Sequence, residues 1–278
     1  MNPPCKICTS SNTHKCFEKD RVCYYRCADC TFVFSEPTTN ANFQTKLEDY
    51  EEAYIGYLQD SVEDPNNFAS LVAWMSQFRT IEGVRVLDIG CGSGKFVRYL
   101  RHRAIEAYGV EPSHVLYEHF LSEDDIFFNL TVDGFRIKFP HDKFDIVTAF
   151  DVIEHVDEPV PFVENISQML KPQGLCFVST LDVASVPARV LGKRWHFYNK
   201  YHMSYWSRDT LAKLASKSNL SLLCSFHCGR FRSVGYMLRY LFEFVFGRSG
   251  ASIPRRLDAI YVSTNLFDTL CLCFGKNS

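Results

Sequence analysis

The sequence lacks several features that would assign it to a broad class at once. No window reaches the roughly 18 apolar residues that a membrane-spanning helix needs, and the start, MNPPCKIC, has neither the basic residues nor the apolar run of a signal peptide. There is no internal repeat and no low-complexity tract. The net charge is only -2 and the pI is near 6.5, so the bulk positive charge that would favour nucleic acid or an acidic membrane is missing. We therefore expect a cytoplasmic globular protein with no transmembrane segment.

The length and composition suit one substantial core with a small additional module. The chain has 278 residues, of which 46% are hydrophobic. Charge is nevertheless uneven along it: residues 37–80 contain two basic and seven acidic side chains, and residues 229–278 contain seven basic and three acidic ones. This distribution predicts an acidic linker and a basic tail.

Cysteine is abundant, and four of the twelve cysteines form two pairs, C-K-I-C and C-A-D-C. Each pair can place two thiolates on one tight turn, so the spacing predicts a tetrahedral zinc site. A segment of about 36 residues is too small to be stabilised by burial alone. We therefore predict a zinc-binding module over residues 1–36, although Cys16, Cys23 and His14 could compete as ligands and the thiols could instead be simply buried. The predicted ligands are Cys5, Cys8, Cys27 and Cys30.

From residue 81 onwards, short apolar runs alternate with segments of helical periodicity. The predicted strands are VRVLDI, EAYGVEP, DIFFNLTV, KFDIVTAFDVI and GLCFVSTLD, with helices between several of them. Such alternation indicates a parallel sheet with helices on both faces, whose ligand site lies at the carboxyl ends of the strands. Residues 37–80 are predicted to form a helical linker, residues 81–182 the core, and residues 183–278 a substrate loop followed by the rest of the same domain.

The stretch VLDIGCGSG places three glycines at alternate positions after the first of these strands. The spacing differs from the dinucleotide-binding fingerprint, which argues against a nicotinamide or flavin cofactor. Glu111 ends the next strand, where a carboxylate can accept the two hydroxyls of a ribose. Such a buried carboxylate needs donors, and we expect the ribose to supply them. Glycine would let the backbone approach a ligand, because a Cβ atom would collide with it.

Together, VLDIGCGSG, GVEPS and FDIVTAFDVIEHV resemble a class I S-adenosylmethionine-dependent methyltransferase. The resemblance implies a Rossmann-like seven-stranded sheet and S-adenosylmethionine as cofactor. The paired cysteines resemble the N-terminal zinc module of methyltransferases from sugar and natural-product pathways. By this resemblance the cofactor is bound by Asp88, Gly90, Cys91, Gly92, Gly94, Glu111, Asp133, Phe150 and Tyr54. Asp133 could instead be a simple turn residue, and Tyr54 a core residue.

Methyl transfer to a hydroxyl usually requires a positioned base. The loop over residues 186–206 carries His202 and His196, which we take as the leading candidates, with His155 and Asp151 next. A structural role is an equally good interpretation of each histidine. The chemistry itself requires no metal, so the predicted zinc is structural or positions the substrate.

The resemblance implies O-methylation of a small molecule such as a sugar or nucleotide-sugar, and N- or C-methylation of such a compound is also compatible with it. One alternative is an RNA base methyltransferase, against which the predicted module has five basic and four acidic side chains. The other is a non-catalytic cofactor-binding scaffold. The helix around Arg232, Arg239 and Arg248 could contact a membrane surface, but packing on the sheet is the preferred interpretation.

Overall fold

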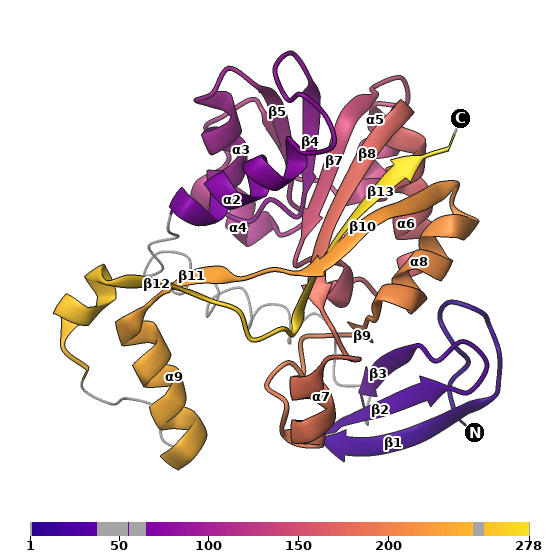
Figure 1. Cartoon of the computed structure of the whole chain (residues 1–278). Helices are drawn as coiled ribbons and strands as arrows, with labels where there is room; N and C mark the ends of the chain where they lie inside the picture. The colour runs from indigo at the N-terminus through magenta and orange to yellow at the C-terminus, as the bar shows by residue number, and fades with distance from the viewer. Residues whose placement is uncertain (1, 38–54, 56–64, 247–252, 278) are drawn as a thin grey trace.

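Figure 1 shows the computed structural model, which describes residues 2–37, 55, 65–246 and 253–277. A seven-stranded sheet forms its centre, in the order β10-β13-β8-β7-β4-β5-β6. Among these seven strands β13 runs antiparallel to both its neighbours, and the others share one direction. The strands are β4 (Arg85–Ile89), β5 (Glu106–Val110), β6 (Phe127–Phe128), β7 (Phe144–Phe150), β8 (Leu170–Leu181), β10 (Leu220–His227) and β13 (Thr269–Lys276).

Helices cover both faces of this sheet, as the alternation predicts. One face packs on α2 (Pro65–Met75) and α3 (Lys95–Arg101), and the other on α5 (Val132–Lys138), α6 (Pro159–Met169) and α8 (Arg208–Lys217). The strands alternate their side chains between the two cores: Cys271 and Cys273 of β13 face α2 and α3, whereas Leu270 and Leu272 face the other layer. The Rossmann-like seven-stranded class is therefore confirmed. Helix α4 (His114–Phe120) follows β5.

The third predicted strand is much shorter than expected. Only Phe127 and Phe128 pair with β5, and the chain then turns into α5. The Thr131 hydroxyl caps that helix by accepting a hydrogen bond from the Gly134 N–H. An acidic residue in the first turn, Asp133, also favours a helix start. Local capping therefore overrides the apolar run that suggested a strand.

The N-terminal module adds its own sheet to one end of the molecule (Figure 1). Strands β1 (Thr13–Lys19), β2 (Val22–Cys27) and β3 (Val33–Pro37) form a meander, and β3 then pairs with β9 (Ser204–Tyr205) from the predicted substrate loop. Phe32 and Phe34 of the module are fully buried in the same core as Trp206. The module thus packs directly on the methyl-transfer domain, and its sheet is completed by the substrate loop.

The C-terminal part contains an arm that projects from the sheet (Figure 1). It consists of β11 (Arg230–Ser233), α9 (Val234–Phe246), η3 (Arg255–Ala259) and β12 (Tyr261–Thr264). The preferred interpretation, that α9 packs on the sheet, is wrong: its main contacts are with η3 and β11. Gly235 lies so close to Asp258 that a Cβ atom there would overlap its carboxylate. The antiparallel β11–β12 ribbon carries the helix outward because it pairs with itself and not with the main sheet.

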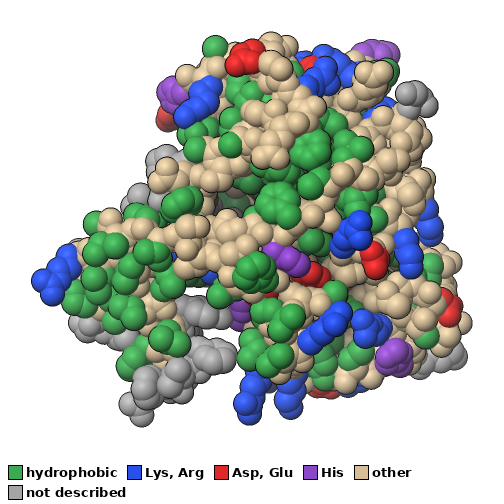
Figure 2. All heavy atoms as spheres, viewed as in Figure 1, with side chains coloured by type: hydrophobic (Ala, Val, Ile, Leu, Met, Phe, Trp, Pro, Cys, Tyr) green, Lys and Arg blue, Asp and Glu red, His purple; other side chains and the backbone are tan. Residues whose placement is uncertain are grey.

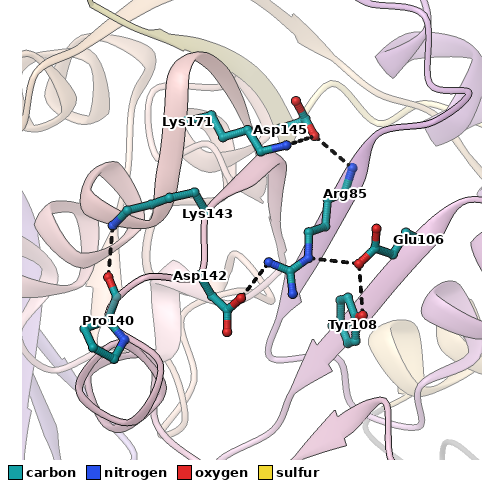
Figure 3. Close-up of polar contacts among 8 residues, drawn as sticks. All are labelled: Arg85, Glu106, Tyr108, Pro140, Asp142, Lys143, Asp145 and Lys171. Atoms are coloured by element: carbon teal, nitrogen blue, oxygen red, sulfur yellow. Dashed lines mark hydrogen bonds and ion pairs between the residues drawn. The ribbon is translucent and has the colours of Figure 1, made fainter.

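The amino ends of the central strands are joined by matched charges (Figure 3). Arg85 of β4 binds Glu106 of β5 at 2.9 Å and Asp142, just before β7, at 2.7 Å. Asp145 of β7 accepts hydrogen bonds from the Arg85 N–H at 3.0 Å and from Lys171 of β8 at 2.7 Å. These contacts join the four neighbouring strands β5, β4, β7 and β8 at their amino ends. The carboxyl ends of the same strands therefore remain available to a ligand.

Candidate functional site

The glycine turn lies at the carboxyl end of β4 and adopts backbone angles that favour glycine. Gly90, Gly92 and Gly94 have φ values of 66°, 55° and 72°. A Cβ atom at Gly90 would lie 2.6 Å from a methyl group of Val152, and one at Gly94 would lie 2.6 Å from Leu121 and Phe127. The sequence suggested that a Cβ atom in this turn would collide with a ligand. At Gly90 and Gly94 it would collide with other side chains of the protein. The glycines are needed to form the turn, whether or not a ligand is bound.

Glu111 organises this turn from the end of β5. The residue is 6% exposed, and its two carboxylate oxygens accept hydrogen bonds from the Gly92 N–H at 2.9 Å and the Ser113 N–H at 3.0 Å. The expectation that only a ribose would supply donors is therefore wrong. A carboxylate offers about four acceptor positions, so these two bonds do not by themselves prevent contact with a ribose.

Asp88 and Cys91 lie on either side of the same turn. The buried Asp88 carboxylate accepts a 2.6 Å hydrogen bond from the Thr148 hydroxyl of the neighbouring β7. The Cys91 sulfur points at Gly109 in the core, and its backbone N–H donates to the Val110 carbonyl. The side chain of Cys91 is thus used for packing, and burial raises the pKa of its thiol well above the usual value.

The remaining predicted cofactor residues are spread around this edge. Phe150 ends β7 and packs edge-to-face on Phe96 of α3, with the ring centroids 5.6 Å apart. Asp133 is exposed at the start of α5, where its carboxylate accepts hydrogen bonds from Arg136 and Asn165. Tyr54 lies outside the described residues, as do most of the predicted linker helix and its other tyrosines.

Asp151 follows β7 and is held in an unusual backbone conformation. Its φ is 56°, which is rare for a residue with a side chain and is characteristic of functional sites. Arg230 of β11 contacts both of its oxygens, at 2.5 and 2.7 Å, and the Ser179 hydroxyl donates to one of them at 2.8 Å. Burial acts to raise the pKa of Asp151, but the charge of Arg230 outweighs it and holds this pKa below the usual value. Sequence reasoning missed Arg230, which is 79 residues away along the chain.

Three further titratable groups meet beside Asp151. Glu154 and His155 lie on η1 (Ile153–His155), and His202 precedes β9. Potential ligand atoms of the three lie within 4.8 Å of one another, and this combination of residue types is also found in metal sites. The segment that carries His202 is held against η1 by two hydrogen bonds. The Met203 N–H donates to the Glu154 carbonyl at 2.7 Å, and the Ser204 hydroxyl donates to the Ile153 carbonyl at 2.9 Å.

Hydrogen bonds assign the tautomers of the two histidines. The Nδ1 atom of His155 lies 3.1 Å from the Tyr201 carbonyl, and that of His202 lies 2.8 Å from the Phe197 carbonyl. A carbonyl only accepts, so each Nδ1 carries a proton, and the Nε2 of each neutral ring carries none. Burial, followed by the charge of His155, lowers the pKa of His202 to about 3. Burial likewise lowers the pKa of His155, and burial followed by the charge of Asp151 raises the pKa of Glu154 to about 8.

His196 lies on the same loop as His202. Its ring packs on Phe197, with centroids 4.0 Å apart, and burial lowers the pKa of the imidazole. The structure therefore brings His202, His155 and Asp151 to the edge that carries the glycine turn and gives His196 a packing contact.

A histidine–carboxylate pair that sequence reasoning missed also lies at the carboxyl ends of the strands. Asp182 directly follows β8, and His227 ends β10, on the far side of β13. The Nε2 atom of His227 is 2.7 Å from an Asp182 oxygen, while the other Asp182 oxygen accepts from the Ala184 N–H at 2.8 Å. The Asp182 side chain is 8% exposed and that of His227 is 32% exposed, so a ligand can reach the imidazole. No local motif signals this pair, because its members are 45 residues apart.

The family model for a methyltransferase domain matches residues 57–225, which is more than half of the chain. The chain belongs to this methyltransferase family. It is an S-adenosylmethionine-dependent methyltransferase with the class I fold.

Two curated relatives of this methyltransferase are named ubiquinone biosynthesis O-methyltransferase. The one from Stutzerimonas stutzeri is 26% identical over 172 residues, which cover 54% of this chain and 73% of the relative. The one from Bradyrhizobium diazoefficiens is 33% identical over 139 residues, covering 46% and 50%. The methyltransferase therefore spans about half the length of this second relative, and 42% of the length of the similar protein from Rhodopseudomonas palustris.

Solved structures share the fold of this methyltransferase. Magnesium protoporphyrin IX methyltransferase from Synechocystis PCC 6803, solved with bound SAH, superposes with a TM-score of 0.57 at 14% identity, covering 84% of this chain and all of that one. A complex of the Haloferax volcanii Trm112 methyltransferase activator with a methyltransferase gives a TM-score of 0.57 at 16% identity, covering 82% and 98%.

The residues of the methyltransferase fit S-adenosylmethionine. The preformed glycine turn and the buried carboxylates of Asp88 and Glu111 lie together at the carboxyl edge of β4 and β5. Carboxylates there suit a cofactor that carries an amine and ribose hydroxyls and no phosphate.

The four paired cysteines of the methyltransferase converge in the N-terminal module. The sulfur atoms of Cys5 and Cys30 are 3.4 Å apart, and those of Cys8 and Cys27 are 3.5 Å apart. All four lie within 4.8 Å of one another. These separations are too long for disulfides and close to the value of about 3.8 Å that tetrahedral zinc with Zn–S bonds of about 2.3 Å requires. Cys16, Cys23 and His14 are not part of this group.

Across the described ranges, no helix is both long enough and apolar enough to cross a membrane.

Proposed function

We propose that this methyltransferase methylates a hydroxyl group of a small molecule, with Asp182 and His227 handling the acceptor's proton. S-adenosylmethionine supplies an activated methyl group on a positively charged sulfur when bound. The chain's own residues must then hold the acceptor in line, exclude water and take up a proton. The observation that carries the proposal is the 2.7 Å pair between His227 and the buried Asp182 at the ligand edge of the sheet.

The direction of the hydrogen bond defines what His227 does. Asp182 accepts from Nε2–H, so Nδ1 is the atom that takes the proton from the acceptor hydroxyl. The carboxylate holds the imidazole in this tautomer and stabilises the imidazolium that forms. His202, the sequence-based candidate, has a pKa of about 3 and its Nδ1 faces a backbone carbonyl, so it is a poor base.

Glu154, His155, His202 and the Asp151–Arg230 pair then form the lining against which the acceptor is oriented. This lining is rich in hydrogen-bonding groups, which supports a polyhydroxylated acceptor such as a sugar or nucleotide-sugar. A phenolic acceptor is the second candidate, because the curated relatives are named for an O-methylation step in ubiquinone biosynthesis.

We also propose that the N-terminal module binds one structural zinc ion through Cys5, Cys8, Cys27 and Cys30. We propose further that the module positions His202. The Ser35 hydroxyl of β3 donates to the His202 carbonyl at 2.8 Å, and the Ser35 N–H donates to the Met203 carbonyl at 3.0 Å. Zinc would order the turns on which β2 and β3 depend, and these strands would hold the loop in place. The predicted domain boundaries and the cytoplasmic location stay predictions.

A methyl-transfer assay with isotopically labelled S-adenosylmethionine tests the proposed reaction. The acceptor panel contains nucleotide sugars, free sugars, catechols and a transfer RNA mixture, and product NMR identifies the methylated atom. We expect a methoxy product from one small-molecule class, and its loss in His227→Ala. Methylation of the RNA mixture alone, or of nitrogen or carbon, would overturn the proposal.

A further inference from the structure

The surface of the substrate loop carries two exposed apolar side chains on one turn of helix. Val186 and Val190 of α7 (Val186–Leu191) are 71% and 78% exposed. They are four residues apart, so they lie on the same face of the helix. Single exposed apolar residues need no explanation, but a helical face that presents two of them outward at this exposure does.

Basic side chains lie close to these valines in the sequence. Residues 186–201 contain four basic side chains and no acidic one. All four are exposed, and no carboxylate of the described residues forms an ion pair with them. They are Arg189, Lys193, Arg194 and Lys200. We refer to these cations together with the two valines as the α7 patch.

The projecting arm adds a second apolar surface at the same end of the molecule. Helix α9 leaves Leu241 55% exposed and Tyr236 40% exposed, and both Leu238 and Phe242 are exposed as well. In Figure 1 the lower end of α9 and helix α7 both reach the lower edge of the molecule. Figure 2 shows hydrophobic side chains over the arm and, in the lower centre where α7 lies, hydrophobic side chains with Lys and Arg beside them.

We propose that this lower face, formed by the α7 patch and α9, docks on a membrane surface that contains anionic phospholipids. Apolar side chains flanked by exposed cations match a surface with phosphate groups above hydrocarbon. The absence of acidic residues from the whole segment 186–201 favours lipid over a protein partner, whose interface would offer charges of both signs. The proposal goes beyond the methyl-transfer reaction and does not depend on the acceptor.

Docking at this face would place the site close to lipid. The α7 patch belongs to the loop that begins beside Asp182 and ends at β9, and the arm begins at Arg230, which binds Asp151. A membrane bound at the lower face would therefore contact two of the segments that contribute to the acceptor side of the site, the loop before β9 and the arm.

Co-sedimentation of the full-length protein with lipid vesicles tests the proposal. One set of vesicles is phosphatidylcholine alone, and the other also contains phosphatidylglycerol. We expect binding to the anionic vesicles that weakens as salt is raised, with little binding to the neutral ones. Because each basic residue near an anionic surface strengthens binding about fivefold, K193E/R194E should weaken it by at least about 25-fold.

Apolar insertion is tested separately by Val190→Asp and Leu241→Asp, each of which should weaken vesicle binding about tenfold. The matched control is Ile137→Asp on α5, where an apolar side chain is 63% exposed at the opposite end of the molecule in Figure 1. It should bind like the unmodified protein. Thermal melts establish that each exposed substitution leaves the fold intact.

Three results would overturn the proposal. One is failure of the unmodified protein to bind anionic vesicles at low salt, and another is equal loss of binding in the control. The third is a protein dimer in light scattering that Leu241→Asp dissociates while vesicle binding stays unchanged. That last result would make the arm an interface between copies of this chain.

Discussion

The two halves of the site are built in different ways. On the cofactor side, Asp88, the glycine turn and Glu111 come from one strand–turn–helix–strand unit of fewer than 30 residues. On the acceptor side, the groups come from η1, the ends of β8 and β10, the loop before β9 and the arm. The comparison teaches that a locally encoded half can be recognised from a motif, whereas an assembled half depends on contacts between distant segments.

The largest effect is expected on the acceptor side, at the proton. His227→Ala should lower turnover by about 10² to 10⁴, because it removes the positioned base. Cofactor affinity should stay within about twofold. His202→Ala should lower turnover by only about tenfold, through the shape of the lining. Steady-state kinetics and calorimetry measure the two quantities.

The exposed His141, at the amino-end edge, supplies the control His141→Ala, which should behave like the unmodified enzyme. Asp182→Asn removes the carboxylate that stabilises the protonated ring of His227. The pH dependence of its turnover should therefore differ from that of the unmodified enzyme. If His202→Ala proves much more damaging than His227→Ala, the sequence-based assignment of the base is right and the one made from the structure is not.

The next effect should follow from loss of the proposed zinc. C27S/C30S should contain about one zinc ion fewer per chain by metal analysis. Turnover should fall about tenfold or more, because the β3 contact with His202 depends on an ordered module. Cofactor binding, which uses the other half of the site, should change less than about twofold.

Cys16→Ser is the matched control for zinc, because Cys16 is an exposed thiol on β1 outside the group of four. Its zinc content should be unchanged. Unaltered zinc content in the double variant would exclude the proposed ligand set.

On the cofactor side, Glu111→Ala should weaken S-adenosylmethionine binding about tenfold or more, as expected when a charged acceptor is lost. Part of that loss would arise from the turn itself, because Glu111 also holds the Gly92 N–H. Glu106→Ala provides the control, since Glu106 is the same residue type at the other end of β5. Equal affinity for both variants in calorimetry would remove Glu111 from the binding site.

The smallest effects should appear in the pH dependence of stability. The folded pKa of His202, about 3, lies below its unfolded value of 6.5, so its contribution is present above pH 6.5 and is lost as the pH falls towards 3. Glu154 has the opposite sign: its folded pKa of about 8 lies above its unfolded value of 4.5, so stability is lost as the pH rises from 4.5 through 8.

Relative to the unmodified protein, His202→Gln should therefore gain melting temperature at pH 4 and Glu154→Gln should gain it at pH 9. Shifts of a few degrees are expected, because about 1 kcal/mol corresponds to about 2–4 °C in a domain of this size. Calorimetric scans in buffer containing EDTA measure these shifts without bound metal. Parallel pH profiles for all three proteins would contradict the proposed protonation states.

Much of the fold could be predicted from the sequence, because burial imposes a local pattern. Strands β4, β5, β7 and β8 and helices α3, α6 and α8 match apolar runs and periodicities, and Ser207 caps α8 as its sequence indicates. The β6–α5 region differs from the predicted long strand because the capping threonine, Thr131, starts a helix there. The packing of α9 also differs, because helical periodicity shows which residues are apolar but not what covers them.

The sequence by itself determined the strand–turn–helix units, the glycine turn and the pairing of cysteines, since each depends on residues close together in the chain. Only the tertiary structure decided that Arg230 pairs with Asp151, that His227 pairs with Asp182, and that β3 holds the loop of His202. Burial in the folded protein also lowers the pKa of His202 to about 3, which its sequence neighbours do not reveal. The reason is that hydrogen bonds and desolvation depend on distances in space, which spacing along the chain specifies only within one local unit.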